Sequence, residues 1–352
     1  MYLSSVSPLP GARASIVHRL IPLVLVAASL AAVAAGQAAQ AQPRVILISC
    51  DGLRPDAIAQ ADAPVLQGLI AGGMYEATAL DEIPPVTLPN HASMVTGLSV
   101  AHHGVLVNTD LPGRIASTTI FDVAKAAGLR VGFFAGKTKL GYLCPEGSVD
   151  AWRMEGDLDV LMDAVVACIE SDDLQLVFVH LGPPDAAGHN YGWMSPEYLA
   201  AVATTDAAIG RITDALDRTG RAASTTVLVA ADHGGHANTH GSDIPEDRDI
   251  PFILHGPGIP AGRGVTEQVH IMDLAATTLH LLGLSTDSAS DGRVITETDA
   301  SGDASSPIPP VSFTGLCAPL PFFMVAAPLL LWRSRGSLRR TYDGGHGTHG
   351  GD

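Results

Sequence analysis

Short, continuous runs of apolar residues recur along the middle of the chain. They cover residues 44–50, 131–135, 174–180, 226–231 and 251–254. A run of this length is typical of a strand that is buried on both faces of a sheet. Segments with helical spacing of apolar positions lie between them, at residues 63–71, 120–127, 157–169, 196–218 and 271–282. Because strands and helices alternate, the pattern predicts an α/β fold with a mostly parallel central sheet and helices on both faces.

The N-terminal pattern differs from that of the middle. Residues 20–35 are almost unbroken apolar, follow Arg13 and Arg19, and precede the small-residue cleavage pattern Ala39-Gln40-Ala41. We therefore predict a signal peptide at residues 1–41 and an exported protein that is periplasmic or at the cell surface. An uncleaved N-terminal membrane anchor is the alternative, although the apolar run is short for a span.

The C-terminal part has a third pattern. Residues 285–310 are rich in Ser, Asp and Pro and predict a linker. Residues 311–332 hold no charged residue, and arginines follow at once, which is typical of a transmembrane or sorting segment. Residues 333–352 form a basic and then Gly- and His-rich tail. Prolines at 319, 321 and 328 weaken a helix, so an unstructured tail is the alternative to membrane attachment.

The charge balance limits the partners of the protein. The 352 residues include 36 acidic and 20 basic side chains, which gives a net charge of −16. A protein that coats nucleic acid needs a cationic surface, so this class is excluded. A small phosphate substrate is still compatible with this charge, because metal ions can supply the positive charge that binds it.

Carboxylates and imidazoles follow three of the predicted strands. They are Asp51 after the first strand, Asp185 and His189 after the strand at 174–180, and Asp232, His233 and His240 after the strand at 226–231. Ligand sites in parallel sheets form at the carboxyl ends of strands, so we expect these side chains to cluster. Three carboxylates and three imidazoles suit two divalent metal ions such as Zn²⁺. Each fragment alone could be a turn or a surface pair; the shared sheet edge carries the prediction.

Thr87 is a candidate nucleophile. Residues 84–97 predict a loop that enters a helix, with Thr87 near its start, Pro89 in its first turn and Gly97 at its end. A hydroxyl at a helix N-terminus lies where a phosphate would bind. Coordination to a metal would activate that hydroxyl near neutral pH. The alternative is that Thr87 is a structural N-cap.

Together these motifs resemble the alkaline phosphatase superfamily, and most closely its nucleotide pyrophosphatase/phosphodiesterase (type I phosphodiesterase) branch. The resemblance covers residues 43–284, the expected catalytic domain, through Asp51-Gly, Thr87-Leu-Pro-Asn-His, His103-Gly-Val-Leu-Val-Asn108, Asp185-x-x-Gly-His189, Asp232-His233-Gly and His240-Gly. It implies that Asp51, Thr87, Asp232 and His233 hold one metal, and that Asp185, His189 and His240 hold the second. It also implies that Asn108 donates to a phosphate oxygen.

The last ligand is chosen from several histidines. His236, His255, His270 and His280 compete with His240. We choose His240 because a glycine follows it and the next segment returns to a strand. We expect His91, His102, His103 and His180 to surround or pack beside the site rather than to bind metal.

The resemblance implies hydrolysis of phosphodiesters or nucleotide pyrophosphates through a phospho-threonine intermediate. Lys137 and Lys139 are similar to the Lys-x-Arg element of threonine-nucleophile phosphomonoesterases, with Lys in place of Arg, so a phosphomonoesterase stays open. Tyr191 and Trp193 lie beside two expected ligands and are candidate substrate contacts. An inactive, membrane-tethered binding module is a further alternative. Such a module would lack a metal ligand or the nucleophile, yet the sequence has a suitable residue at every expected position.

Overall fold

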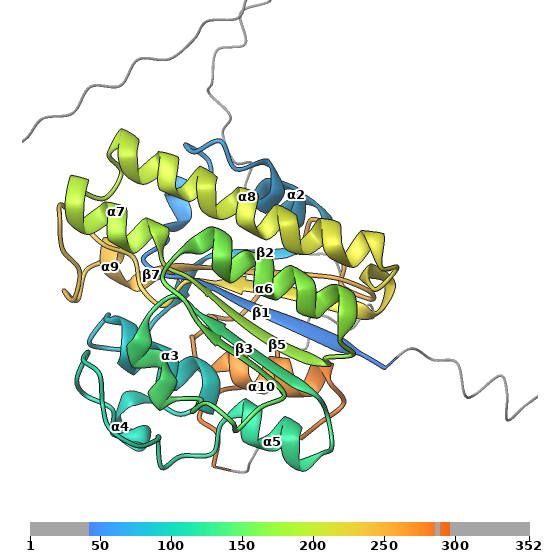
Figure 1. Ribbon diagram of the computed structural model, residues 1–352. Helices are drawn as coiled ribbons and strands as arrows, with labels where there is room; N and C mark the ends of the chain where they lie inside the picture. Colours follow the sequence, from blue (N-terminus) through green and yellow to red (C-terminus); the bar gives the residue numbers. More distant parts are fainter. Residues whose placement is uncertain (1–41, 286–288, 296–352) are drawn as a thin grey trace, which may run out of the picture. The chain divides into compact units, whose positions relative to one another are not determined.

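The computed structural model describes residues 42–285 and 289–295, all of which belong to one compact unit. Seven strands form one sheet in the order β2-β7-β6-β1-β5-β3-β4 (Figure 1). The strands are β1 Arg44–Cys50, β2 Met74–Leu80, β3 Val131–Ala135, β4 Ala151–Met154, β5 Leu176–Leu181, β6 Thr225–Ala230 and β7 Asp249–His255. Only β7 runs against the others in this sheet, since it is antiparallel to both β6 and β2. The predicted α/β fold with a mostly parallel sheet is confirmed.

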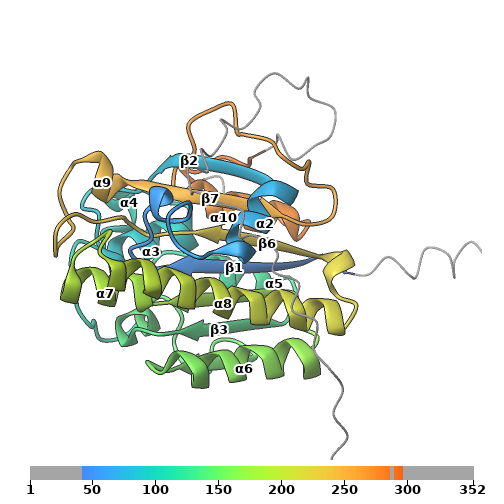
Figure 2. The same cartoon turned by 90° about the horizontal axis from the view of Figure 1, so that it is seen from above.

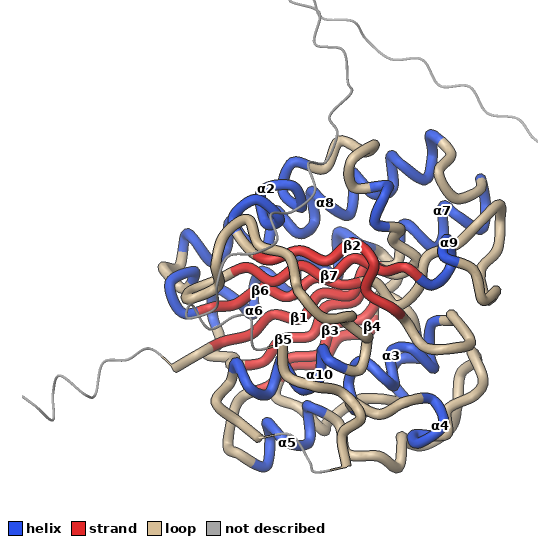
Figure 3. The backbone as a smooth tube through the Cα atoms, turned by 180° about the vertical axis from the view of Figure 1, so that it is seen from behind, coloured by secondary structure: helices blue, strands red, loops and turns tan. Residues whose placement is uncertain are grey.

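Helices cover both faces of the sheet. They are α2 Pro64–Gly72, α3 Thr87–Thr96, α4 Val100–His103, α5 Ile120–Ala126, α6 Leu158–Ser171, α7 Pro183–Tyr191, α8 Pro196–Arg218, α9 Pro245–Arg248 and α10 Asp273–Leu281, with short 3₁₀ helices at Pro55–Ala57, Thr138–Tyr142 and Ala222–Ser224. In Figures 1 and 2, α2, α6 and α8 lie on one face, and α3, α5 and α10 lie on the other. Figure 3 shows the strands enclosed between these two layers. The sheet is therefore buried on both faces, as its continuous apolar runs require.

The three central strands end level with one another. Ser49 near the end of β1 pairs with His180 in β5 and with Ala230 in β6. All three strands run in the same direction, so the residues that follow them emerge at one edge of the sheet. This register brings together chain segments that are more than a hundred residues apart.

Two strands have no counterpart in the sequence analysis. In β2 only Met74 and Ala79 are buried, and β4 has only four residues, with Arg153 exposed. Both strands lie at the ends of the strand order, and the outer side of β2 contacts a loop through bridges to Arg263 and His270. Neither one has the continuous apolar run by which buried strands are recognised.

The folded part extends beyond residue 284. Residues 289–295, which the sequence assigns to a linker, pack against the domain: Asp291 and Gly292 donate backbone hydrogen bonds to Gly97, and Ile295 is fully buried. The predicted signal peptide at 1–41, the segment at 311–332 and the tail at 333–352 lie outside the described residues. Among the helices of the described residues, none is both long and apolar enough to cross a bilayer.

Candidate active site

The carboxylates of the site follow the three central strands. Asp51 comes directly after β1, Asp185 lies in the first turn of α7 after β5, and Asp232 lies just after β6. The Asp185 N–H donates to the Asp51 carbonyl at 3.0 Å. Gly52 adopts φ +69°, and a Cβ there would lie 3.0 Å from the Asp185 Cα. Glycine is required here because a side chain would collide with Asp185. The segments that contain Asp51 and Asp185 therefore contact each other through their main chains.

These carboxylates meet three imidazoles. One group of potential ligand atoms comprises Asp51, Asp232 and His233, a second comprises Asp185, His233 and His240, and within each group all atoms lie within 4.8 Å of one another. The Nε2 of His189 lies 3.3 Å from Asp185 Oδ1 and so adjoins the second group. The structure therefore brings together all six strand-end residues that the sequence singles out.

The hydrogen bonds of the three histidines fix their tautomers. Nδ1–H donates to a backbone carbonyl in each case: His189 to Asn238 at 3.1 Å, His233 to Gly234 at 2.8 Å, and His240 to Pro85 at 2.8 Å. Because a carbonyl accepts only from N–H, the neutral ring keeps its lone pair on Nε2. All three Nε2 atoms face the carboxylates, which is how a histidine is held as a metal ligand.

The carboxylate oxygens are short of partners. Asp51 Oδ1, Asp185 Oδ1 and Asp232 Oδ2 are buried and have no hydrogen-bond partner among the described residues. A buried carboxylate oxygen without a hydrogen-bond partner is costly, so a cation is the fitting counterpart for these three oxygens.

The spacing of the ligand atoms supports the same counterpart. His233 Nε2 lies 3.5 Å from Asp51 Oδ1 and 3.4 Å from Asp232 Oδ2, and His240 Nε2 lies 3.6 Å from Asp185 Oδ1. Neighbouring ligands around tetrahedral zinc are separated by about 3.3 Å, given bonds of about 2.0 Å. The donor set therefore fits two divalent cations.

Thr87 faces this cluster rather than capping its helix. It is the first residue of α3, Val86 is the N-cap, and no side chain caps the helix start. The Thr87 Oγ1 lies 3.5 Å from His233 Nε2 and 3.5 Å from Lys137 Nζ. The N-cap alternative is therefore not what the structure shows. The side-chain amide of Asn90, which the sequence analysis did not single out, donates to three carbonyls of the preceding loop and so fixes Thr87.

Lys137 ties the two halves of the cluster together. Its Nζ lies 2.7 Å from Asp51 Oδ2 and 2.6 Å from Asp185 Oδ2. Burial alone would lower the pKa of Lys137, but the carboxylates of Asp51 and Asp185 outweigh burial and raise it. Burial likewise would raise the pKa of Asp51, and the Lys137 ammonium brings it well below its usual range. Lys137 thus stays charged beside the Thr87 hydroxyl.

Asn108 is held with one end of its amide free. Its Oδ1 accepts from the Leu88 N–H at 3.0 Å and from Lys139 Nζ at 3.1 Å. The Nδ2 amino group is thereby left to donate to a ligand. Lys139 contacts Asn108 rather than the carboxylates, so it orients the amide.

His180 and His91 support the cluster without joining it. Gly136 N–H donates to His180 Nδ1, so His180 Nε2–H donates to Asp51 Oδ2 at 2.8 Å. Burial lowers the pKa of His180 and keeps it neutral. His91 Nδ1–H donates to the Thr87 carbonyl at 2.8 Å. Such outer hydrogen bonds orient the groups that bind a metal.

The two predicted aromatic contacts have different places. Tyr191 is 61% exposed at the end of α7, but Trp193 is 7% exposed. The Trp193 indole N–H donates to the Gly52 carbonyl at 2.9 Å, and its ring meets the His189 ring edge-on. Trp193 therefore packs behind a candidate ligand with little of its surface exposed, while Tyr191 is open to a ligand. Sequence analysis missed Leu106 and Val107, which are exposed directly before Asn108.

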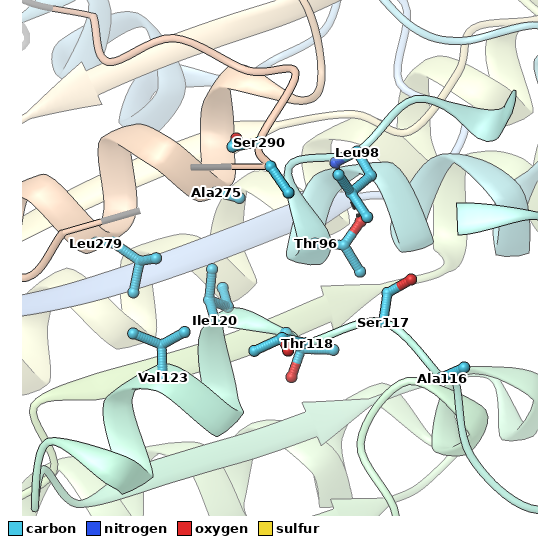
Figure 4. Close-up of a pocket in the computed structure, with 12 residues that line it drawn as sticks. Thr96, Leu98, Ala116, Ser117, Thr118, Ile120, Val123, Ala275, Leu279 and Ser290 are labelled. Carbon is cyan, nitrogen blue, oxygen red and sulfur yellow. Dashed lines mark hydrogen bonds between the residues drawn. The ribbon is translucent and has the colours of Figure 1, made fainter. Parts of the chain in front are cut away.

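A cavity of about 260 Å³ lies away from this cluster, among α3, α5 and α10 (Figure 4). Thr96, Ile120, Val123, Ala275 and Leu279 help to line it, and none of the predicted site residues does. The candidate chemistry is therefore at the sheet edge and not in this cavity.

Comparisons with known proteins agree with this architecture. The family model described as type I phosphodiesterase / nucleotide pyrophosphatase matches residues 45–250. Human ectonucleotide pyrophosphatase/phosphodiesterase family member 7 is 27% identical over 241 residues, which cover 60% of this chain and 53% of the relative. The chain thus spans about half the length of that relative.

Solved structures share the fold. Murine ectonucleotide pyrophosphatase/phosphodiesterase 5, as an inactive variant in complex with AMP, superposes with a TM-score of 0.61 at 18% identity over 70% of this chain and 96% of that one. A 2-O GAG sulfatase superposes with a TM-score of 0.62 at 17% identity over 76% of each chain. The match of the family model over more than half of the sequence shows that this chain belongs to the type I phosphodiesterase / nucleotide pyrophosphatase family.

Proposed function

We propose that the protein hydrolyses phosphodiesters or nucleotide pyrophosphates in a metal-dependent reaction, with Thr87 as the nucleophile. The observation that carries this proposal is the position of the Thr87 hydroxyl, which faces imidazole lone pairs and buried carboxylate oxygens that lack hydrogen-bond partners, instead of capping its helix. Family membership supports the phosphoester class of substrate.

Two sets of residues would hold the metals. Asp51, Thr87, Asp232 and His233 form the first set, and Asp185, His189 and His240 form the second. The mixture of imidazole and carboxylate donors fits zinc. Two bound zinc ions would supply positive charge to the attacking and leaving oxygens of an in-line displacement.

Side chains of the protein supply the nucleophile and the contacts to the substrate. Thr87 Oγ1 gives up its proton to solvent and attacks phosphorus, while the P–O bond to the leaving alcohol or nucleotide breaks and the leaving oxygen takes up a proton from water. Water then attacks the phospho-threonine, which releases phosphate or a phosphate monoester and returns Thr87 to its hydroxyl form. Asn108 Nδ2–H donates to a non-bridging phosphate oxygen, while Leu88 and Lys139 hold the amide in that orientation. The donor is in place before the substrate arrives, which favours the transition state. Tyr191 is exposed at the end of α7 and would contact the leaving group.

Replacement of Thr87 tests the nucleophile. We expect Thr87→Ala to lower kcat by more than about 10³-fold, since the group that forms the covalent bond is lost. Metal content, measured by plasma mass spectrometry, should stay near wild type, because six other ligands remain. Thr87→Ser keeps a hydroxyl and serves as the matched control that retains activity. A Thr87→Ala variant with full hydrolytic rate would remove Thr87 from the reaction.

A second candidate function is phosphomonoester hydrolysis, and the position of Lys137 favours it. Its ammonium lies 3.5 Å from the Thr87 hydroxyl, where it would meet the extra negative charge of a monoester. The comparison of bis-p-nitrophenyl phosphate with p-nitrophenyl phosphate, for wild type and Lys137→Ala, separates the two functions. If diesters are the substrate, kcat/KM should be higher for the diester in wild type. If monoesters are the substrate, Lys137→Ala should reduce monoester turnover far more than diester turnover.

We also propose that residues 1–41 direct export and that residues 311–332 attach or sort the protein. The names of the ectonucleotide relatives agree with action outside the cell. N-terminal sequencing of the mature protein from the expressing cell would test the cleavage expected after Ala41.

A further inference from the structure

Asp247 lies in α9, outside the candidate ligands, and binds both ends of the loop that presents His240. Its side chain is fully buried. Oδ1 accepts from His236 Nδ1 at 2.7 Å, and Oδ2 accepts from the Ser242 N–H at 2.7 Å. The Asp247 carbonyl also accepts from the Gly234 N–H at 2.7 Å. One residue therefore fixes the loop at its start, its middle and its end.

The loop contains a tight turn that outside contacts must hold. Asp247 provides several of these contacts, beside the Gly235 N–H that donates to the Glu246 carbonyl at 2.7 Å and Arg54 Nη1 that donates to the Gly235 carbonyl at 3.1 Å. His236 and Thr239 exchange two backbone hydrogen bonds of 2.9 Å across a tight turn. Ala237 in this turn has φ +45°, an unfavourable backbone for a residue with a side chain. Such a conformation persists only where surrounding contacts impose it. The hydrogen bonds from His236 and Ser242 to Asp247 flank the turn and contribute to that constraint, together with a hydrogen bond to the Ala237 carbonyl itself.

The same turn also reaches the second candidate ligand. Trp193 N–H donates to the Ala237 carbonyl at 2.7 Å, and His189 Nδ1–H donates to the Asn238 carbonyl at 3.1 Å. The turn thus fixes the tautomer of His189 and leads directly to His240. A shift of the turn would move both imidazoles relative to Asp185.

We propose that Asp247 is a positioning residue for the half of the site formed by Asp185, His189 and His240. This inference rests on the proposed function, because it takes a divalent metal as the occupant. Asp247 acts through the loop and does not touch that metal. It holds the turn between His233 and His240, so that the Nε2 atoms of His189 and His240 face Asp185. In the other half of the site, Asp51 and Asp232 lie at strand ends. His233 adjoins the loop only through Gly234, whose N–H binds the main-chain carbonyl of Asp247 and not its side chain.

The test measures zinc affinity of each site in the purified full chain, by competition with a chromophoric chelator. We expect Asp247→Ala to weaken one of two zinc sites by roughly 10- to 100-fold, the range typical for loss of a residue that orients metal ligands from outside the coordination sphere. The other zinc site should keep its wild-type affinity. Thermal unfolding of the metal-free protein provides the structural baseline.

Two controls flank this variant. Asp247→Asn can still accept from Ser242 and can donate to His236 once that ring changes tautomer, so it should bind both zinc ions within about threefold of wild type. Asp243→Ala changes an exposed carboxylate of the same loop, whose partner is Arg248, and should also leave both sites unchanged. If Asp247→Ala does not fold, His236→Phe removes only the Oδ1 contact and should weaken the same site by less.

The outcomes separate the two proposals. If wild type binds two zinc ions and Asp247→Ala matches it at both sites, Asp247 has no positioning role. Equal weakening of both sites, together with a lower unfolding midpoint of the metal-free variant, would also overturn the proposal, because the effect is then general. If wild type itself binds no zinc, the proposed metal-dependent function fails, and this inference falls with it.

Discussion

Single hydrogen bonds decide the protonation of several histidines around the site. His103 is a clear case, because the Val105 N–H donates to its Nδ1 at 3.0 Å and its Nε2–H is then left to donate to Ser93 Oγ at 2.9 Å. Burial lowers the pKa of His103 to about 4. A protonated His103 would lose the Val105 hydrogen bond at the start of the segment that leads to Asn108. Neutral His103 is therefore part of what keeps that segment in place.

This arrangement predicts a pH dependence of stability. The pKa of His103 is about 4 in the fold, below the ordinary value of about 6.5 for an unfolded chain. The contribution of neutral His103 to the free energy of unfolding is therefore complete above pH 6.5, and it is lost as the pH falls toward 4. We expect the free energy of unfolding to drop more between pH 7 and pH 4.5 in wild type than in His103→Asn, as measured by urea denaturation. An equal drop of the unfolding free energy in wild type and in His103→Asn would show that His103 does not cause this pH dependence.

At the residue scale, the sequence predicted the members of the site better than their roles. Asp51, Asp185 and Asp232 could be found because each follows a recognisable strand, and strand ends meet. Trp193 is almost fully buried, which chain proximity to His189 could not reveal. Asn90 was visible only as part of a motif, and Asp247 left no signal, since the roles of both come from backbone contacts formed only in the fold.

At the scale of elements, the interior was predictable and the edges were not. The continuous apolar runs located β1, β3, β5, β6 and β7, because two covered faces demand apolar side chains at every position. The edge strands β2 and β4 are partly exposed and lack that pattern. The segment at 289–295 resembles a linker in composition, yet it packs on α3 through backbone hydrogen bonds.

A pair of glycine substitutions at helix ends tests how tightly residues 289–295 pack on α3. Gly97 ends α3 with φ +71°, and Gly104 ends α4 with φ +70°. A Cβ at Gly97 would meet Ser290 Oγ at 2.7 Å and Ala275 Cβ at 3.3 Å, whereas a Cβ at Gly104 would meet nothing within 4 Å. We expect Gly104→Ala to cost about 1–2 kcal/mol from backbone strain alone, and Gly97→Ala to cost at least about 1 kcal/mol more from crowding. Equal losses in urea denaturation would show that residues 289–295 add nothing to the packing.

At the scale of the whole molecule, negative charge dominates both the chain and the site. The net charge is −16, and three buried carboxylates converge on a cluster that contains one ammonium group, from Lys137. Buried charges of like sign destabilise the fold unless cations compensate them. Metal binding should therefore stabilise the protein as well as activate it.

Chelation tests this coupling. We expect removal of metal to abolish hydrolysis and to lower the unfolding midpoint, and zinc to restore both. Free zinc at 100 times its Kd would add about 2.7 kcal/mol of stability. Differential scanning fluorimetry with and without chelator measures the shift, and Asp185→Asn should show a smaller one. An unchanged midpoint and undiminished hydrolysis after exhaustive chelation would contradict a metal site.

The contact between Gly52 and Asp185 has a consequence for metal choice. The two segments meet main chain to main chain, with the Asp185 N–H bonded to the Asp51 carbonyl. The distance between the two halves of the site is therefore set by the polypeptide backbone and not by flexible side chains. A larger ion such as Ca²⁺, with longer bonds and more ligands, would have to rotate side chains out of their hydrogen bonds to enter. If the site holds metal ions as proposed, ion size would thus be discriminated through a glycine that is not itself a ligand.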